Sequence, residues 1–125
     1  MILRISRWLL AAGFVAAGVY HFVSPAAYVA IVPPQLPRPE ALVAISGVAE
    51  IAGGLGILWQ PTRRIAAAGL IALLVAVFPA NIYAAVTGME IGDRAVPQWL
   101  LWVRLPLQPL FIAWVYVACC RAEKD

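Results

Sequence analysis

The sequence is poor in charged residues, which make up only 12% of its 125 residues, whereas 64% are hydrophobic. Charged residues normally account for about a quarter of a soluble domain. The basic residues behind the net charge of +3 stand in short clusters beside apolar runs and form no basic face, so nucleic acid is not an expected partner. The composition predicts one small domain surrounded by lipid.

Residues that commonly hold cofactors are also scarce. The only cysteines are the adjacent Cys119 and Cys120, and the only histidine is His21. Adjacent cysteines give neither a disulfide framework nor a metal-ligand spacing. The chain has no CxxC, GxGxxG or P-loop motif and no histidine pair suited to haem. We expect no metal site, and no cofactor is evident from the motifs.

Long apolar runs are present instead, and they cover residues 2–23, 41–59, 65–88 and 99–120. An apolar helix of about 20 residues can cross the hydrocarbon core of a bilayer, which is about 30 Å thick. The sequence therefore predicts an all-α integral membrane four-helix bundle. Between the runs we expect a tight turn over residues 60–64 and a polar loop over residues 89–98.

The first apolar run has two interpretations. Arg4 and Arg7 lie near its start, ahead of the uninterrupted apolar part, as in a cleaved signal peptide, but the run continues through Tyr20–Phe22, which favours a retained span. Within it, Gly13, Ala17 and His21 follow one another at helical spacing. We expect this seam of small residues to face a neighbouring helix and to direct His21 into the bundle.

A proline-rich loop, residues 24–40, separates the first two runs. Its prolines exclude a continuous helix, yet Tyr28, Ile31 and Leu36 are apolar or aromatic. A hydrated linker would not need such side chains. We expect a short interfacial helix over Pro25–Ile31, followed by an extended lid that lies on the bundle.

Basic residues near the ends of the runs predict the orientation. Only Arg38 and Arg94 fall on one side of a four-span arrangement, and the other side holds Arg4, Arg7, Arg63, Arg64, Arg121 and Lys124. Positive residues are enriched on the cytoplasmic side of a membrane. Both termini should therefore be cytoplasmic.

Each expected span also carries a polar side chain, and together these form the candidate site: His21, Glu50, Asn81, Arg104 and Gln108. A charge at the bilayer centre costs about 2.5–3.5 kcal/mol on insertion scales. We therefore expect these groups to meet inside the bundle, with Glu50 and Arg104 as an ion pair and His21 able to exchange protons with the outer aqueous phase. Alternatively, they only hold the helices together.

Six segments, in this order, resemble a known family: GVYHFVSP (18–25), IVPPQLP (31–37), ISGVAEIAGGLGIL (45–58), PTRR (61–64), FPANIY (78–83) and RLPLQPL (104–110). The chain is similar over nearly its whole length to the DoxX/DoxX-like family of small four-span bacterial membrane proteins. The resemblance implies the bacterial cytoplasmic (inner) membrane and an association with membrane redox chemistry, including quinone-coupled reactions. It assigns no role to individual residues. Members linked to disulfide chemistry carry cysteine pairs that this chain does not match.

Three functions remain open at this point. The first is a redox component that binds a quinone or similar lipophilic aromatic molecule, at most the membrane subunit of an oxidoreductase complex, with electrons supplied by a redox partner protein. The second is a non-catalytic assembly subunit. The third is a small transporter, which would need to be a homo-oligomer because one four-span chain is small for alternating access.

Overall fold

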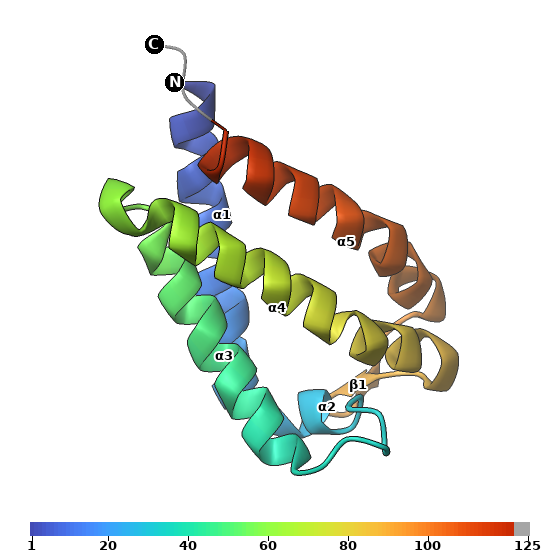
Figure 1. Ribbon diagram of the computed structural model, residues 1–125. Coiled ribbons are helices and arrows are strands. Elements are labelled where there is room, and N and C mark those ends of the chain that lie inside the picture. Colours follow the sequence, from blue (N-terminus) through green and yellow to red (C-terminus); the bar gives the residue numbers. More distant parts are fainter. Residues whose placement is uncertain (122–125) are drawn as a thin grey trace.

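The computed structural model describes residues 1–121, and these fold into helices and one short hairpin (Figure 1). The elements are α1 (Ile2–Val23), α2 (Pro25–Val29), α3 (Pro39–Gly56), α4 (Gln60–Thr87), β1 (Glu90–Ile91), β2 (Arg94–Ala95) and α5 (Gln98–Cys119). The prediction of a mainly helical protein is confirmed. The four long helices lie where the four apolar runs were found.

The connection between α3 and α4 is shorter than predicted. The expected tight turn over residues 60–64 is wrong, because these residues form the first turn of α4. Pro61 is well suited to the start of a helix, where its missing N–H is not needed. The Thr62 hydroxyl donates to the Gly56 carbonyl at 2.7 Å, and Arg63 Nε donates to the Ile57 carbonyl at 2.7 Å. These bonds hold the end of α3 against the start of α4.

The proline-rich segment contains the short helix that the sequence predicts. This helix, α2, buries Ala27 on the bundle, and Ile31 is buried just beyond it. The rest of the segment does not cover the bundle as expected, since Leu36 is 47% exposed. α3 then begins at Pro39, with Glu40 in its first turn, where a carboxylate is favourable for the helix dipole.

Residues 89–98 were predicted as a polar loop, but they include a two-stranded antiparallel hairpin. α4 ends at Gly88, whose φ of +91° suits glycine, and Gly92, with a φ of +61°, starts the turn between β1 and β2. Met89 is only 7% exposed. The segment therefore packs one side chain into the protein.

The long helices form two pairs, α1 with α3 and α4 with α5, and α3 also packs on α4. In Figure 1 the pairs meet near the two chain termini and diverge toward the opposite end, where α2 and the hairpin lie. One apolar cluster fills the closed end, with Leu10, Phe14, Ile57, Leu70 and Val115 among its members. A second cluster at the other end includes Ala27, Ile31, Ala85, Met89 and Leu101.

Small residues bring α1 and α3 unusually close. A Cβ atom at Gly18 would lie 2.6 Å from the Gly47 carbonyl oxygen, and one at Gly54 would lie 3.1 Å from the Ala11 carbonyl oxygen. These positions are seven residues apart on each helix, so the contact recurs after two turns. This packing fixes how the side chains of the two helices face each other.

The seam predicted from Gly13 and Ala17 is therefore wrong in register. Gly13 is exposed and nothing lies within 4 Å of a Cβ placed there. The buried face of α1 instead contains Ala11, Phe14, Gly18 and His21. The expectation that His21 points into the bundle is correct, since it is only 8% exposed.

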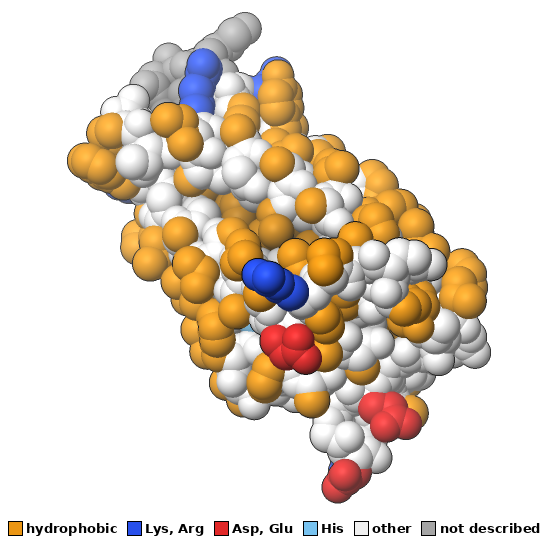
Figure 2. Space-filling view, turned by 60° about the horizontal axis from the view of Figure 1, so that its bottom comes forward, with side chains coloured by type: hydrophobic (Ala, Val, Ile, Leu, Met, Phe, Trp, Pro, Cys, Tyr) orange, Lys and Arg blue, Asp and Glu red, His pale blue; other side chains and the backbone are white. Residues whose placement is uncertain are grey.

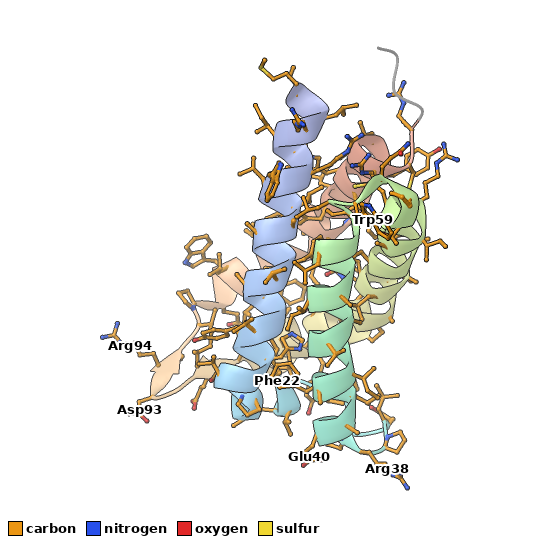
Figure 3. All side chains as sticks on the ribbon, turned by 90° about the vertical axis from the view of Figure 1, so that its left-hand side faces the viewer. Phe22, Arg38, Glu40, Trp59, Asp93 and Arg94 are labelled. Carbon is orange, nitrogen blue, oxygen red and sulfur yellow. The ribbon has the colours of Figure 1, made fainter. Side chains whose placement is uncertain are left out.

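The outer surface of the helices is apolar. α1, α4 and α5 are long and apolar enough to cross a membrane. α3 is not in that set, although it too exposes large apolar side chains such as Ile45 (65%). Figure 2 shows hydrophobic side chains over much of one face, with basic side chains at its top, a basic side chain beside an acidic one near its middle, and further acidic side chains toward its lower edge. In Figure 3, Arg38, Glu40, Asp93 and Arg94 all lie at the end opposite Trp59.

Candidate functional site

His21 and Glu50 form a close pair between α1 and α3, which we call the dyad. His21 Nε2 lies 3.2 Å from Glu50 Oε2, and His21 Nδ1 lies 3.1 Å from the Val43 carbonyl oxygen. The pair is possible because Gly18 and Gly47 allow the two backbones to approach just beside it. Glu50 Oε2 is buried, and its contact with His21 is a close approach, since no described residue forms a hydrogen bond of ordinary geometry with this atom.

The surroundings of the His21 ring favour one tautomer. A carbonyl oxygen can only accept a hydrogen bond, so the 3.1 Å contact with Val43 favours a proton on Nδ1. Nε2 then faces the Glu50 carboxyl group across the 3.2 Å contact. The two groups can share a proton there, as an imidazolium beside a carboxylate or as a neutral imidazole beside a carboxylic acid.

Tyr28 of α2 covers the dyad. Its ring centroid lies 4.1 Å from that of His21. The Tyr20 ring packs edge-on against the Tyr28 ring, with 6.2 Å between their centroids. Burial raises the pKa of the Tyr28 phenol, the Glu50 carboxylate raises it further, and the Arg104 guanidinium lowers it. Tyr28 therefore stands within electrostatic range of both the dyad and Arg104.

The remaining candidate residues form a hydrogen-bonded chain between α4 and α5, which we call the amide network. Arg104 Nη2 donates to Asn81 Oδ1 at 2.9 Å, Asn81 Nδ2 donates to Gln108 Oε1, and Gln108 Nε2 donates to the Leu74 carbonyl. Every bond runs in the same direction, from the guanidinium toward the backbone. The network therefore fixes the position of the Arg104 side chain.

The expected ion pair between Glu50 and Arg104 is wrong. Within residues 1–121, Glu50 pairs with His21, and the contacts of the Arg104 guanidinium are Asn81 and the Met89 sulfur at 3.8 Å. The reason is helix packing. α3 is held tightly against α1, whereas Arg104 belongs to α5, which packs on α4. The candidate residues therefore gather in two groups, one on each helix pair.

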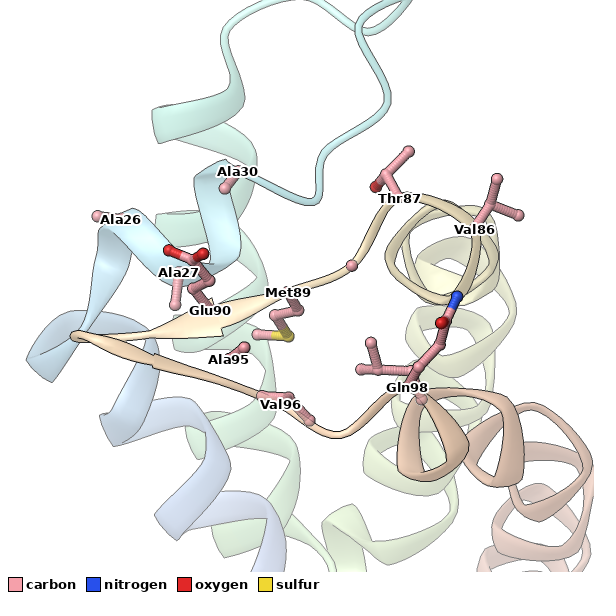
Figure 4. Close-up of a pocket in the computed structure, with 12 residues that line it drawn as sticks. Ala26, Ala27, Ala30, Val86, Thr87, Met89, Glu90, Ala95, Val96 and Gln98 are labelled. Atoms are coloured by element: carbon pink, nitrogen blue, oxygen red, sulfur yellow. The ribbon is translucent and has the colours of Figure 1, made fainter.

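A cavity of about 610 Å³ lies near this region, between α2, the end of α4, the hairpin and the start of α5 (Figure 4). Its lining includes Ala27, Met89, Gln98 and Leu101. Met89 also contacts Arg104, so this one side chain stands between the cavity and the amide network.

Tyr28 and Met89 are the site residues that the sequence did not reveal. Tyr28 was recognised only as an apolar loop residue and Met89 as part of a polar loop. A signal existed for Tyr28, since it lies one residue from Ala27 and three from Ile31, and both of those are buried. Met89 carried no comparable pattern, because its burial depends on the hairpin.

The cysteines lie away from this region, at the end of α5. Cys119 is buried and Cys120 is half-buried, and both are free thiols. Among the described residues no three side chains of the kinds that usually bind metals are gathered together.

Comparison with known proteins places the chain in one family. Residues 10–119 match a family described as a domain of unknown function, DUF8561. The chain belongs to this family. No curated protein and no solved structure matches it. The match includes all the long helices in whole or large part, together with the dyad and the amide network, so these groups lie inside the DUF8561 domain.

Proposed function

We propose that this DUF8561 protein crosses the membrane four times, with α3 as the additional span. α3 packs along α1 through Gly47 and Gly54. Both helices expose large apolar side chains on their outer faces. The only carboxylate in its middle, Glu50, is paired with His21 inside the protein, which lowers the cost of inserting it. The excess of basic residues near the termini and near Arg63 supports cytoplasmic termini in a bacterial inner membrane.

This topology is testable by cysteine labelling. Single cysteines at Leu36, Gln60 and Asp93 are introduced in a Cys119→Ser/Cys120→Ser background. A membrane-impermeant maleimide should label positions 36 and 93 in intact cells, and position 60 only after permeabilisation. Labelling of position 60 together with 36 in intact cells would show that α3 does not cross the membrane.

We further propose that the protein binds a quinone, or a similar lipophilic carbonyl compound, as a component of membrane redox chemistry. The proposal is carried by one observation: apolar surroundings contain both a fixed cationic hydrogen-bond donor, Arg104, and a dyad that can hold a proton. A quinone oxygen accepts hydrogen bonds, which Arg104 can donate. Reduction to the quinol takes up two electrons and two protons. The dyad can exchange protons, and a redox partner protein would supply the electrons.

The resemblance to the DoxX-like family supports the same proposal, since that family is linked to quinone-coupled chemistry. Tyr28 adds an aromatic surface beside the dyad, and the nearby cavity is large enough for a small ligand. Apolar walls with a few fixed polar groups are the usual make-up of such a site.

Binding should be measured with the purified protein in lipid nanodiscs and a short-chain quinone analogue. Glu50→Gln and Arg104→Gln should each weaken binding. The matched control is Arg94→Gln, which removes the same charge from an exposed position on the hairpin and should leave binding unchanged. Absent binding, or equal binding by all four proteins, would contradict the proposal.

A non-catalytic assembly subunit is the second candidate, and the amide network favours it. Its hydrogen bonds end on the Leu74 backbone and tie α4 to α5, as polar side chains often do in membrane proteins. This candidate predicts that Gln108→Leu lowers the melting temperature and that no small molecule raises it. A ligand-dependent rise in melting temperature would exclude it.

A further inference from the structure

Arg104 carries a positive charge that no carboxylate in the described part of the chain balances. A guanidinium stays protonated in proteins. Its contacts are an amide oxygen of Asn81 and the sulfur of Met89, and both are uncharged. No Asp or Glu oxygen of residues 1–121 lies within 4.0 Å of it. A lone charge of this kind is costly inside a membrane protein.

The nearest candidate for a counter-charge is already in use. Glu50 is the carboxylate that interacts electrostatically with Tyr28, as Arg104 does, but its close partner is His21 at 3.2 Å. The described residues therefore give the Arg104 guanidinium no carboxylate of its own.

The guanidinium is also held ready for a further partner. It has five N–H donors, and its two contacts occupy only some of them. The bonds through Asn81 and Gln108 to the Leu74 backbone orient it before any ligand arrives. An oriented guanidinium favours planar oxygen anions, which can accept two parallel hydrogen bonds.

We propose that Arg104 selects a ligand in its anionic form, with a deprotonated acidic hydroxyl or a carboxylate attached to an apolar body. This inference rests on the proposed function, because it specifies the class of quinone that the site takes. The ligand loses its proton to water and then binds as the anion, which gives the guanidinium the anionic partner that the described residues do not supply. Asn81 and Gln108 are positioning residues for the guanidinium.

The test compares two quinones of nearly equal shape at neutral pH, 2-hydroxy-1,4-naphthoquinone, which is ionised, and 2-methoxy-1,4-naphthoquinone, which cannot ionise. Binding is measured by calorimetry in nanodiscs of zwitterionic lipid, so that anionic lipid does not compete. The wild-type protein should bind the ionised quinone at least about tenfold more tightly, because charge-assisted hydrogen bonds are the stronger ones. Arg94→Gln should keep this preference.

Asn81→Asp provides the sharpest variant. It places a carboxylate where the Asn81 amide oxygen now accepts from Arg104, with almost no change in shape, although it gives up the Nδ2 donor to Gln108. The variant keeps Arg104 but supplies the missing counter-charge, so the preference for the ionised quinone should disappear. Arg104→Gln should abolish the preference as well, and Arg104→Lys should retain part of it.

The outcomes separate the two proposals. If the wild-type protein binds both quinones equally, the site does not select an anion, whereas quinone binding itself stands. If the Asn81→Asp protein keeps the full preference, Arg104 is not its source. If neither quinone binds, both the inference and the proposed function are overturned.

Discussion

The contact between α1 and α3 can be tested by adding a single methyl group. Alanine at Gly18 would place its Cβ 2.6 Å from the Gly47 carbonyl oxygen and 2.7 Å from the Ile51 side chain. The side chain can move, but the carbonyl belongs to the α3 backbone. Restoring an ordinary contact of 3.4 Å requires the helices to separate by about 0.8 Å. Overpacking of this kind typically costs about 1–3 kcal/mol.

Gly13→Ala is the matched control, since Gly13 lies on the same helix with nothing within 4 Å of the added atom. Alanine is a better helix former than glycine by up to about 1 kcal/mol, so this variant should be as stable as the wild type or slightly more so. Stability would be measured by reversible unfolding in mixed detergent, followed by circular dichroism. Equal stability of the two variants would refute the close approach of α1 and α3.

A second measurement links this packing to the dyad. His21 is the only histidine, so ¹⁵N labelling of histidine reports one ring alone. Separation of the helices in the Gly18→Ala protein should lengthen the 3.2 Å contact between Nε2 and Glu50 and shift the Nε2 signal. The Gly13→Ala signal should match the wild type. An unchanged Nε2 signal in the Gly18→Ala protein would show that the dyad does not depend on this glycine contact.

Three further outcomes are expected. In the wild-type protein the ¹⁵N spectrum should show a proton on Nδ1 of His21, and a deprotonated Nδ1 would contradict the tautomer inferred from the Val43 contact. Glu50→Gln should stay within about 1 kcal/mol of wild-type stability because its amide can donate to Nε2, whereas Glu50→Ala should lose about 1–3 kcal/mol by leaving that nitrogen unpaired. Thr62→Val should cost about 1 kcal/mol in unfolding experiments through loss of the bond to the end of α3, and a neutral effect would show that water replaces it.

The sequence predicted the long helices well because their signal is local. Apolar runs of about 20 residues define these helices, and Pro39 and Pro61 mark the starts of α3 and α4. The start of α4 was missed because residues 60–64 were interpreted as a tight turn, although proline is common in the first turn of a helix. The hairpin was missed because its strands have two residues each and carry almost no periodic pattern.

The candidate residues were predicted, but their partners were not. Polar side chains inside apolar runs can be found from sequence alone, and they selected His21, Glu50, Asn81, Arg104 and Gln108 together. Partner choice depends instead on which helices pack and on which faces. That was decided by Gly18 and Gly47, and the register of the α1 seam was predicted from Gly13 in place of Gly18. An error of this kind rotates the helix face and changes every partner across it.

Of the two ionisable groups Glu50 and Arg104, Arg104 gives the stronger reason to expect an anionic ligand. A buried carboxylate can remove its own charge by taking up a proton, and Glu50 has His21 to share one with. A guanidinium cannot lose its charge by a proton transfer of this kind at accessible pH, because it stays protonated. Neutrality around Arg104 must therefore come from another anion, and the described residues place none beside it. An aspartate at position 81 would supply that anion but lose the donor to Gln108, whereas a bound anionic ligand would balance Arg104 and leave every bond of the amide network in place.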